Sequence, residues 1–210
     1  GGEAKIGAND KWIKVKDARE ALARAAAVIN GNPSHQLDLV GITGTNGKTS
    51  VAHWVAQALS QQGRKTAIIG TAGNGFPGTL TPALNTTPDA IELQQRLAYY
   101  RQQGATACAM EVSSHGLVQG RANGTSFNVA VLTNLSRDHL DYHGDMDRYA
   151  AAKAQLFSWP GLASVVLNLD DPFGQQLEHS IRSTRVAGYG FQRGAVVGEK
   201  LRLSQNGLQL

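Results

Sequence analysis

The chain has 210 residues, of which 41% are hydrophobic and 17% charged, so it is long enough for one large or two small domains with a sizeable core. Its 24 glycines have no three-residue period, which excludes a collagen, and the low charge excludes a charge-rich disordered chain. The net charge of +4 arises within residues 181–210, whereas residues 1–180 carry 15 basic and 15 acidic side chains. Because no basic stripe with interleaved aromatic residues is present, we expect no nucleic-acid partner.

The first predicted element is an alanine-rich helix over residues 17–28. It is followed by Asn30-Gly31-Asn32-Pro33-Ser34, a cluster of helix-breaking residues that indicates a domain boundary. No apolar run approaches the roughly 18 residues that a membrane-spanning helix needs, so we expect no membrane partner.

Strands and helices are predicted to alternate after this boundary. Apolar runs of strand length occur at residues 37–43, 66–70, 105–112, 127–133 and 163–169, and helical periodicity occurs at 50–62, 89–103 and 145–157. We expect Thr87 and Pro88 to open the second of these helices, and residues 85–87 to lie in a loop that follows the stretch 71–84, which is rich in Gly, Thr and Pro. The pattern predicts an α/β fold with a mainly parallel sheet flanked by helices.

The single cysteine, Cys108, lies within one of the apolar runs and is expected to be buried. One thiol cannot form an intramolecular disulfide, and the sequence contains no secretory signal pattern, so we expect a reducing, cytoplasmic location. At the other end of the chain, Asn206-Gly207 predicts a hairpin turn.

Polar residues follow the predicted strands where each strand ends. Gly44-Thr45-Asn46 follows the first run, Glu111 ends the third, and Asn134 follows the fourth. Because ligands bind at the carboxyl ends of the strands in open α/β sheets, we expect these residues to gather at one site.

The segment around residues 39–50 predicts a strand, a glycine-rich turn and a helix, which together form a phosphate-binding loop. Lys48 is expected to reach the β- and γ-phosphates of ATP, and the Thr49 hydroxyl to bind Mg²⁺. The pattern is a tight Gly-x-x-Gly-Lys-Thr, because Ile42 stands where the general motif has a further glycine. The expected nucleotide-binding residues are Gly44, Thr45, Asn46, Gly47, Lys48, Thr49 and Ser50.

The run Thr-Gly-Thr-Asn-Gly-Lys-Thr at 43–49 resembles the ATP-binding loop of the Mur ligase family, which includes peptidoglycan amino-acid-adding enzymes and folylpolyglutamate synthase. Three further motifs strengthen the resemblance, which extends from about residue 12 to the C-terminus. They are Leu-Asn-Thr-Thr-Pro at 84–88, Met-Glu-Val-Ser-Ser-His-Gly-Leu-Val-Gln-Gly-Arg at 110–121, and Asn-Leu-Ser-Arg-Asp-His-Leu-Asp-Tyr-His-Gly at 134–144. Together the four motifs look like those of the members that add the third residue of the stem peptide.

The resemblance implies an ATP-dependent amide ligase of peptidoglycan precursor synthesis. ATP would phosphorylate the γ-carboxylate of D-glutamate in UDP-N-acetylmuramoyl-L-Ala-D-Glu, and the amine of an amino acid, expected to be meso-diaminopimelate, would attack the acyl phosphate. Cations are needed because triphosphate and carboxylate repel each other as they approach. We expect a monomer whose partners are these small molecules.

The resemblance assigns catalytic roles to Lys48, Glu111, His139 and Lys153. Glu111 and His139 would bind Mg²⁺ together with Thr49, although imidazole is not a typical Mg²⁺ ligand. Lys153 would carry a carbamate formed with CO₂, which replaces a cation that repels the metal with an anion that binds it. Outside this family, a helix lysine is normally solvated and a strand-end carboxylate is a surface group.

The resemblance also assigns a set of residues to the UDP-muramoyl-peptide. Arg121 suits a carboxylate or pyrophosphate because its guanidinium donates in a bidentate fork. The remaining members are Asn85, Thr86, Thr87, Ser113 and Gln119. From their sequence alone, the residues at 85–87 also fit a turn and a helix cap. His115 and His143 are expected to be structural or peripheral, and residues 168–171 resemble a family segment near the nucleotide.

Three domains cooperate in this family. The resemblance implies that residues 1–34 end an N-terminal UDP-binding domain and that 35–210 form an incomplete central ATP-binding domain, without the C-terminal domain that selects the amino acid. An L-lysine-adding enzyme therefore stays open. A folylpolyglutamate-type ligase should lack the motifs at 84–88 and 110–121. A non-catalytic nucleotide-binding module would tend to lose groups such as Lys48 and Glu111, which are present.

Overall fold

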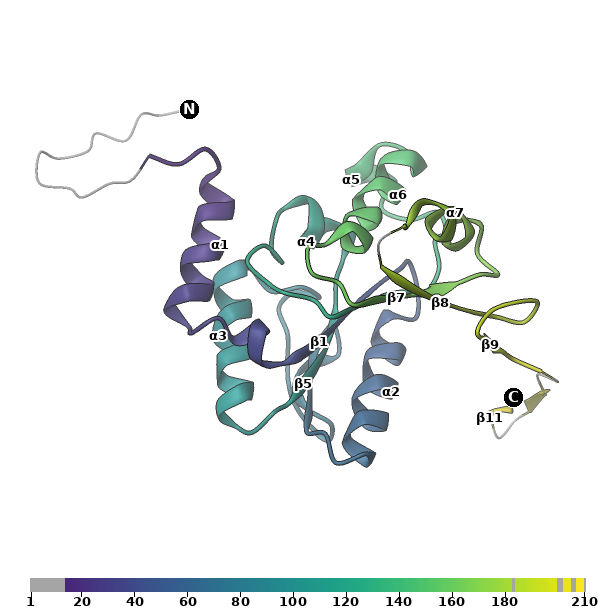
Figure 1. The fold of residues 1–210 in the computed structure, drawn as a ribbon, viewed down its shortest axis with the longest axis horizontal. Coiled ribbons are helices and arrows are strands. Elements are labelled where there is room, and N and C mark those ends of the chain that lie inside the picture. Colours follow the sequence, from purple (N-terminus) through teal and green to yellow (C-terminus); the bar gives the residue numbers. More distant parts are fainter. Residues whose placement is uncertain (1–13, 183, 200–201, 205–206, 210) are drawn as a thin grey trace, which may run out of the picture.

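A computed structural model describes residues 14–182, 184–199, 202–204 and 207–209 (Figure 1). The helices are α1 (Ala18–Ile29), α2 (Lys48–Gln61), α3 (Ala90–Gln102), α4 (Ser114–Val118), α5 (Leu140–His143), α6 (Met146–Ala154) and α7 (Pro172–Ser180), with 3₁₀ turns η1 (Pro33–Gln36) and η2 (Gln155–Ser158). The strands are β1 (Asp38–Thr43), β2 (Thr66–Gly70), β3 (Gly73–Phe76), β4 (Thr79–Thr81), β5 (Ala107–Glu111), β6 (Val129–Leu132), β7 (Ser164–Asn168), β8 (Arg185–Gly190), β9 (Val196–Val197), β10 (Arg202–Ser204) and β11 (Gly207–Gln209).

Nine of these strands form one sheet in the order β4-β3-β2-β5-β1-β6-β7-β8-β9. The strands from β2 to β9 along this order run parallel, whereas the pairings of β2 with β3 and of β3 with β4 are antiparallel. The expected α/β fold with a mainly parallel sheet is therefore confirmed. All five strands and all four helices predicted from the sequence are present, with shifts of a few residues at their ends.

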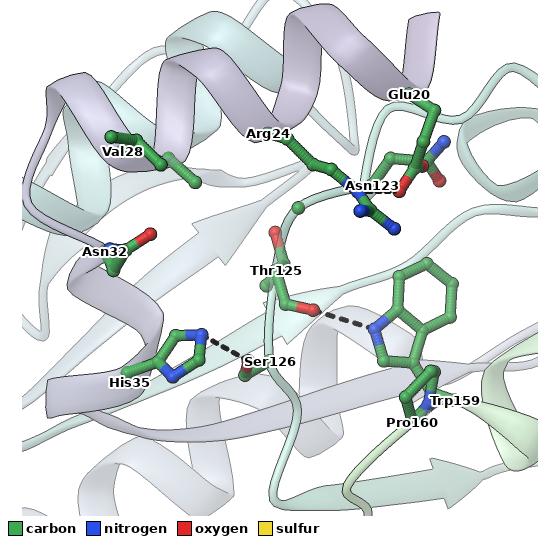
Figure 2. Close-up of a pocket in the computed structure, with 12 residues that line it drawn as sticks. Glu20, Arg24, Val28, Asn32, His35, Asn123, Thr125, Ser126, Trp159 and Pro160 are labelled. Atoms are coloured by element: carbon green, nitrogen blue, oxygen red, sulfur yellow. Dashed lines mark hydrogen bonds and ion pairs between the residues drawn. The ribbon is translucent and has the colours of Figure 1, made fainter. Parts of the chain in front are cut away.

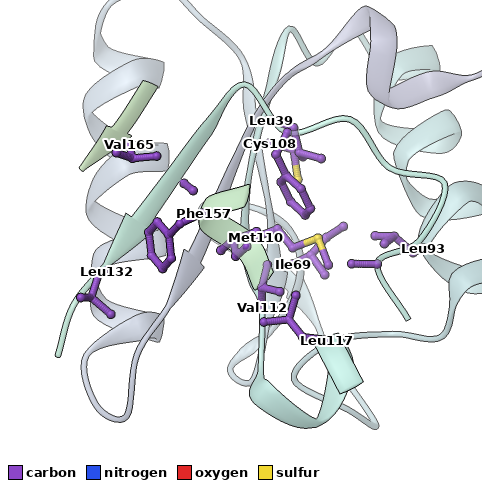
Figure 3. Close-up of a cluster of buried hydrophobic side chains, with 14 of the residues drawn as sticks. Leu39, Ile69, Leu93, Cys108, Met110, Val112, Leu117, Leu132, Phe157 and Val165 are labelled. Carbon is purple, nitrogen blue, oxygen red and sulfur yellow. The ribbon is translucent and has the colours of Figure 1, made fainter. Parts of the chain in front are cut away.

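Each face of the sheet has its own core. On one face, α2 packs Ala52 and Ala56 against Ile42 and Ile68, and α2 covers this side of the sheet in Figure 1. The opposite face carries a larger cluster that contains Leu39, Cys108, Met110, Leu93 and Phe157 (Figure 3). Alternate side chains of a strand point to opposite faces, so both cores draw on the same apolar runs. Cys108 is fully buried, as expected, and burial raises the pKa of its thiol.

Residues 71–84, where the sequence pattern predicts no strand, contain a hairpin of β3 and β4. Its glycines are required by close backbone packing, because a Cβ at Gly73 would lie 2.7 Å from the Thr81 carbonyl oxygen and one at Gly75 equally close to that of Thr79. Glycine-rich sequence disfavours a strand on propensity alone, so the packing outweighs the local preference.

The structure differs from the sequence prediction at the start of α3 and agrees with it at the hairpin near residue 206. Asp89, and not Thr87, caps α3, since its carboxylate accepts from the N–H groups of Ile91 and Glu92. The pairing of β10 with β11 forms the expected hairpin, although Asn206 itself lies outside the described residues. Among the described residues, no helix is long and apolar enough to cross a membrane.

The topology gathers the strand ends that matter for function. β2, β5, β1 and β6 are neighbours and parallel, so their carboxyl ends open on one edge. Gly70, Glu111, Thr43 and Leu132 end these four strands. The residues that follow them therefore converge, as the sequence predicts.

Candidate functional site

The phosphate loop connects β1 to α2 in the expected strand–turn–helix arrangement. Gly44 and Gly47 have φ of 149° and 81°, which side chains rarely adopt, and a Cβ at Gly44 would lie 1.8 Å from Thr133 Oγ1. Gly47 caps α2 without a side-chain hydrogen bond, so the first N–H groups of the helix point toward the loop. A helix N-terminus of this kind attracts phosphate.

Lys48 opens α2 and turns its ammonium back over the loop. Nζ donates to the carbonyl oxygens of Gly44 at 3.0 Å and Thr45 at 2.9 Å. Burial lowers the pKa of Lys48, while the charges of Glu111 and Asp138 oppose that shift. The side chain thus lies at the loop and can exchange these carbonyl oxygens for phosphate oxygens.

Lys153 lies on α6 and is only 1% exposed. Nζ donates to the Gly44 carbonyl oxygen at 2.8 Å and lies 4.5 Å from the centroid of the Tyr149 ring. Burial first, and then the charge of Lys48, lower the pKa of Lys153 to about 7, against a weaker opposing effect of Asp138. The lysine that the sequence would place in solvent is therefore enclosed directly behind the phosphate loop.

Glu111 ends β5 with its carboxylate almost completely buried. The Thr71 N–H donates to Oε1 at 2.9 Å, and the Thr71 hydroxyl donates to Oε2 at 3.2 Å. A Cβ at residue 70 would lie 2.1 Å from Oε1, so a side chain at this position would displace the carboxylate. The carboxylate is thus held in one orientation at the end of the central strands.

The predicted peptide-binding residues at 85–87 differ in their surroundings. Thr86 shares a 2.9 Å hydrogen bond between hydroxyls with Thr71, whereas the side chain of Asn85 is exposed. Thr87 is fully buried, with its hydroxyl 3.0 Å from the Glu111 carbonyl oxygen and 3.2 Å from Ser113 Oγ. Thr87 therefore ties the loop to the end of β5, and the two preceding residues face the pocket.

Ser113, Gln119 and Arg121 belong to α4 and the turn after it. Ser113 caps α4 by accepting from the Gly116 N–H. Arg121 donates from Nη1 to the Thr87 carbonyl oxygen and from Nε to Gln119 Oε1. The guanidinium has five N–H groups, so three are left for an anion in the pocket, while Gln119 orients the group.

His139 has φ of 50°, a left-handed conformation that non-glycine residues adopt rarely. Asp138 accepts from the His139 N–H at 2.8 Å and lies 3.5 Å from its ring Nε2. His115 lies edge-on to His139, with ring centroids 4.9 Å apart, and its ring is tilted by 39° against that of Tyr142, with centroids 4.1 Å apart. Burial, followed by the charges of His139 and Arg121, lowers the pKa of His115.

These segments enclose a cavity of about 460 Å³. Its lining includes Thr45, Asn46, Gly47, Lys48 and Thr49 of the phosphate loop, together with Thr71, Asn85, Thr86, Glu111, Ser113, His115, Arg121 and His139. Of the residues expected at the site, Gly44, Ser50, Thr87, Gln119 and Lys153 do not line it. Among the described residues, no three His, Cys, Asp or Glu side chains form a group that could hold a metal.

Some residues of the site were not singled out by the sequence. Thr71 lies in a stretch for which the sequence predicts no element or role, and His115, expected to be structural or peripheral, lines the cavity. His143 is buried and hydrogen-bonded to Ser114, which fits the structural role expected for it. Asp171 caps α7 and accepts from the Leu135 N–H. The 168–171 segment therefore stabilises the start of α7 and the chain that follows β6, next to the site.

A second cavity, of about 480 Å³, lies away from this edge of the sheet, between α1, η1 and the turn at 123–126 (Figure 2). The Trp159 indole N–H donates to the Thr125 carbonyl oxygen, and His35 is hydrogen-bonded to Ser126. None of the residues predicted from the sequence to form a site lines this cavity.

Comparison with known proteins identifies relatives of the chain. Residues 42–210 match the family described as Mur ligase middle domain. The chain is 54% identical over 200 residues to the UDP-N-acetylmuramoyl-L-alanyl-D-glutamate--2,6-diaminopimelate ligase of Chromobacterium violaceum, which covers 94% of this chain and 41% of that protein. It is likewise 54% identical over 177 residues to the ligase of the same name from Pseudomonas aeruginosa, covering 84% of this chain and 36% of that protein.

Comparison with solved structures points to the same family as the comparison of sequences. A structure of a UDP-N-acetylmuramoyl-L-alanyl-D-glutamate--2,6-diaminopimelate ligase superimposes with a TM-score of 0.84 at 36% identity, covering 98% of this chain and 43% of that one. Folylpolyglutamate synthase from Mycobacterium tuberculosis shares the fold with a TM-score of 0.65 at 19% identity. The chain thus spans about two fifths of the length of the ligases that it matches.

Proposed function

Because the chain belongs to the Mur ligase family, we propose that it forms the ATP-binding part of a ligase that adds meso-diaminopimelate to UDP-N-acetylmuramoyl-L-Ala-D-Glu. The substrates are those in the names of its relatives, which are 47–55% identical. One observation supports this function above others: the phosphate loop, Glu111 and Arg121 face one cavity. A nucleotide-binding module alone would need a carboxylate for Mg²⁺, but it would not need the guanidinium group of Arg121 facing the same cavity.

The phosphate loop would hold the triphosphate. Lys48 is already beside the loop carbonyl groups and would carry its positive charge to the β- and γ-phosphates. The first N–H groups of α2 add positive potential at the same place. This arrangement draws electron density from the γ-phosphorus, which the substrate carboxylate would attack to form an acyl phosphate and release ADP.

The donors at the pocket suit Mg²⁺ when Lys153 is counted as a carbamate. Glu111, Thr49 and His139 line the pocket, but they do not include three anionic or imidazole donors. Lys153 does not itself line the pocket, and a carbamate on its Nζ would have to reach the pocket past Gly44 to supply the missing anion. Mg²⁺ bound there would neutralise charge between phosphate and carboxylate. The pKa of about 7 supports this assignment, since CO₂ reacts with a neutral amine.

The carbamate can be tested by chemical rescue. The Lys153→Ala variant should lose ligase activity, and a small carboxylate such as formate or acetate should restore part of it by taking the place of the carbamate. Recovery by chloride at the same ionic strength would argue against a role for the carboxylate group. Glu111→Ala is the matched variant: it should not respond to the same small acid if the rescue is specific to the space behind Gly44.

Arg121 would position the acceptor substrate. Its three remaining N–H groups can bind a carboxylate or the pyrophosphate, and Gln119 and the Thr87 carbonyl oxygen hold the guanidinium in place. Thr86 and Asn85 line the same cavity and offer hydroxyl and amide groups for the peptide. Correct placement of the carboxylate beside the γ-phosphate would supply most of the rate enhancement.

We propose the family's domain arrangement for the whole protein. Residues 1–34 would end a UDP-binding domain, residues 35–210 would belong to the central domain, and a further domain would select the amino acid. α1 and the 3₁₀ turn η1 that follows it pack on helix α3 of the central domain. The proposed boundary near residue 34 therefore separates segments that are in contact. The cytoplasm, where ATP and UDP-linked precursors are found, is the proposed location.

The function is tested with the full natural polypeptide that contains these residues. We expect phosphate release from ATP only when UDP-N-acetylmuramoyl-L-Ala-D-Glu and meso-diaminopimelate are both present. L-lysine in place of diaminopimelate distinguishes the lysine-adding alternative. Absence of phosphate release with either amino acid would contradict the proposal.

A further inference from the structure

Tyr149 connects three segments of the site although it does not line the cavity. It lies on α6, one helical turn before Lys153, and its side chain is fully buried. Its hydroxyl is 3.2 Å from Thr45 Oγ1, which belongs to the phosphate loop 104 residues earlier in the sequence. Residues four positions apart share a helix face, so Tyr149 and Lys153 both point at the back of this loop.

The Thr45 hydroxyl is also bound to the segment that carries His139. The Ser136 N–H donates to Thr45 Oγ1 at 2.9 Å, and Thr45 Oγ1 lies 3.1 Å from the Ser136 carbonyl oxygen. A carbonyl oxygen can only accept, so the single hydroxyl hydrogen of Thr45 goes to Ser136. Tyr149 must therefore donate to Thr45, which completes a network of three hydrogen bonds.

The ring of Tyr149 lies close to Lys153 and to two histidines. Its face lies 4.5 Å from Lys153 Nζ, and its centroid is 5.1 Å from that of His143 and 6.1 Å from that of His139. Burial raises the pKa of the Tyr149 hydroxyl, so the group stays protonated and remains a donor. One side chain thus contacts the phosphate loop, the helix of Lys153 and the segment of His139.

We propose that Tyr149 is a positioning residue, which fixes Thr45 and Ser136 so that the phosphate loop keeps the shape required for a nucleoside triphosphate. The inference rests on the proposed function only in that the pocket binds nucleotide. Loss of the hydroxyl would leave Thr45 with one partner segment instead of two. The loop would then sample other arrangements, and nucleotide would have to select the competent one.

The test compares Tyr149→Phe with Tyr100→Phe in the full natural polypeptide. Tyr100 is a matched control, since it is 2% exposed, lies on α3 with its hydroxyl beside Arg96, and is outside the cavity. We expect Tyr149→Phe to raise the Kd for ATP and ADP by about fivefold, the effect of one hydrogen bond. The KM for ATP should rise with the Kd, while the KM for the muramoyl-peptide stays unchanged. Both variants lose one buried hydroxyl, so they should lower Tm by similar amounts. Tyr100→Phe should do so without changing the nucleotide Kd.

A double-mutant cycle with Thr45→Val separates positioning from a general loss of packing. Tyr149→Phe should have no further effect on nucleotide Kd in the Thr45→Val background, because the shared hydrogen bond is already gone. Thr45→Ser keeps the hydroxyl and should retain the affinity. Unchanged affinity in Tyr149→Phe, or full additivity in the cycle, would overturn the inference alone. Absence of nucleotide binding by the unsubstituted protein would overturn the proposed function and the inference together.

Discussion

Lys48 and Lys153 donate to the same atom, the Gly44 carbonyl oxygen, at 3.0 and 2.8 Å. Two ammonium groups on one acceptor repel each other, and the proximity is unfavourable because Lys153 is buried. Burial and the charge of Lys48 together lower the pKa of Lys153 to about 7. The phosphate loop thus brings together one lysine suited to carry charge to a phosphate and a second that is readily neutral.

The first prediction concerns the pH dependence of carbamate formation. Lys153 is protonated below about pH 7 and neutral above it, and only the neutral amine reacts with CO₂. At a fixed concentration of dissolved ¹³CO₂, the carbamate signal in ¹³C NMR should increase between about pH 6 and pH 8. Lys153→Met should show no such signal. A signal that appears only near pH 10, where ordinary lysines lose their proton, would contradict the lowered pKa.

The second prediction concerns Lys48→Met. Removing the like charge should raise the pKa of Lys153, so the half-point of carbamate formation should move to higher pH. The same variant should bind ATP at least about tenfold more weakly, because charged hydrogen bonds to phosphate are lost. Lys65→Met serves as control, since Lys65 bonds the Gln103 carbonyl oxygen outside the cavity. An unchanged pH profile in Lys48→Met would show that burial alone sets the pKa.

The third prediction follows from the absence of a side chain at Gly70. A methyl group at this position would collide with the Glu111 carboxylate, so Gly70→Ala should lower the free energy of unfolding by about 1–3 kcal/mol and displace Glu111. Urea denaturation of Gly70→Ala, Glu111→Ala and the double variant measures this. Gly70→Ala should cost little in the Glu111→Ala background. Equal effects in both backgrounds would mean that the strain arises elsewhere.

The fourth prediction concerns the hydroxyl of Thr71. It lies within hydrogen-bonding distance of both Glu111 Oε2 and Thr86 Oγ1, and so joins the carboxylate to the loop proposed for the peptide. Thr71→Val should raise the KM for the muramoyl-peptide by about fivefold, the effect of one lost hydrogen bond. Thr71→Ser retains the hydroxyl and should behave like the unsubstituted protein. A loss in Thr71→Ser but not in Thr71→Val would contradict the role of the hydroxyl and point to the methyl group, which valine retains and serine lacks.

The sequence predicted the parallel sheet and the phosphate loop because both depend on local patterns. Apolar runs mark the buried strands, and a glycine-rich turn between a strand and a helix is typical of phosphate binding. The convergence of Glu111, Asn134 and the loop also followed, since parallel strands bring their carboxyl ends to one edge.

Contacts between distant segments could not be predicted in this way. Tyr149 meets Thr45 across 104 residues, and no local pattern marks a tyrosine on a helix as part of a phosphate site. The strands β3 and β4 depend on close backbone packing that glycine permits. The presence of glycine in a sequence does not by itself predict such packing. The burial of Lys153 is a tertiary effect as well, because a lysine at this helix position would be solvated in isolation.

The most direct test of the proposed ligase chemistry follows the oxygen atoms of the substrate carboxylate. If an acyl phosphate forms, a carboxylate oxygen becomes the bridge to phosphorus and leaves with phosphate when the amine attacks. The full natural polypeptide, given muramoyl-dipeptide labelled with ¹⁸O in the γ-carboxylate, should therefore release inorganic phosphate that contains one ¹⁸O atom. Unlabelled phosphate formed during amide synthesis would contradict the account, because the carboxylate would not have been phosphorylated.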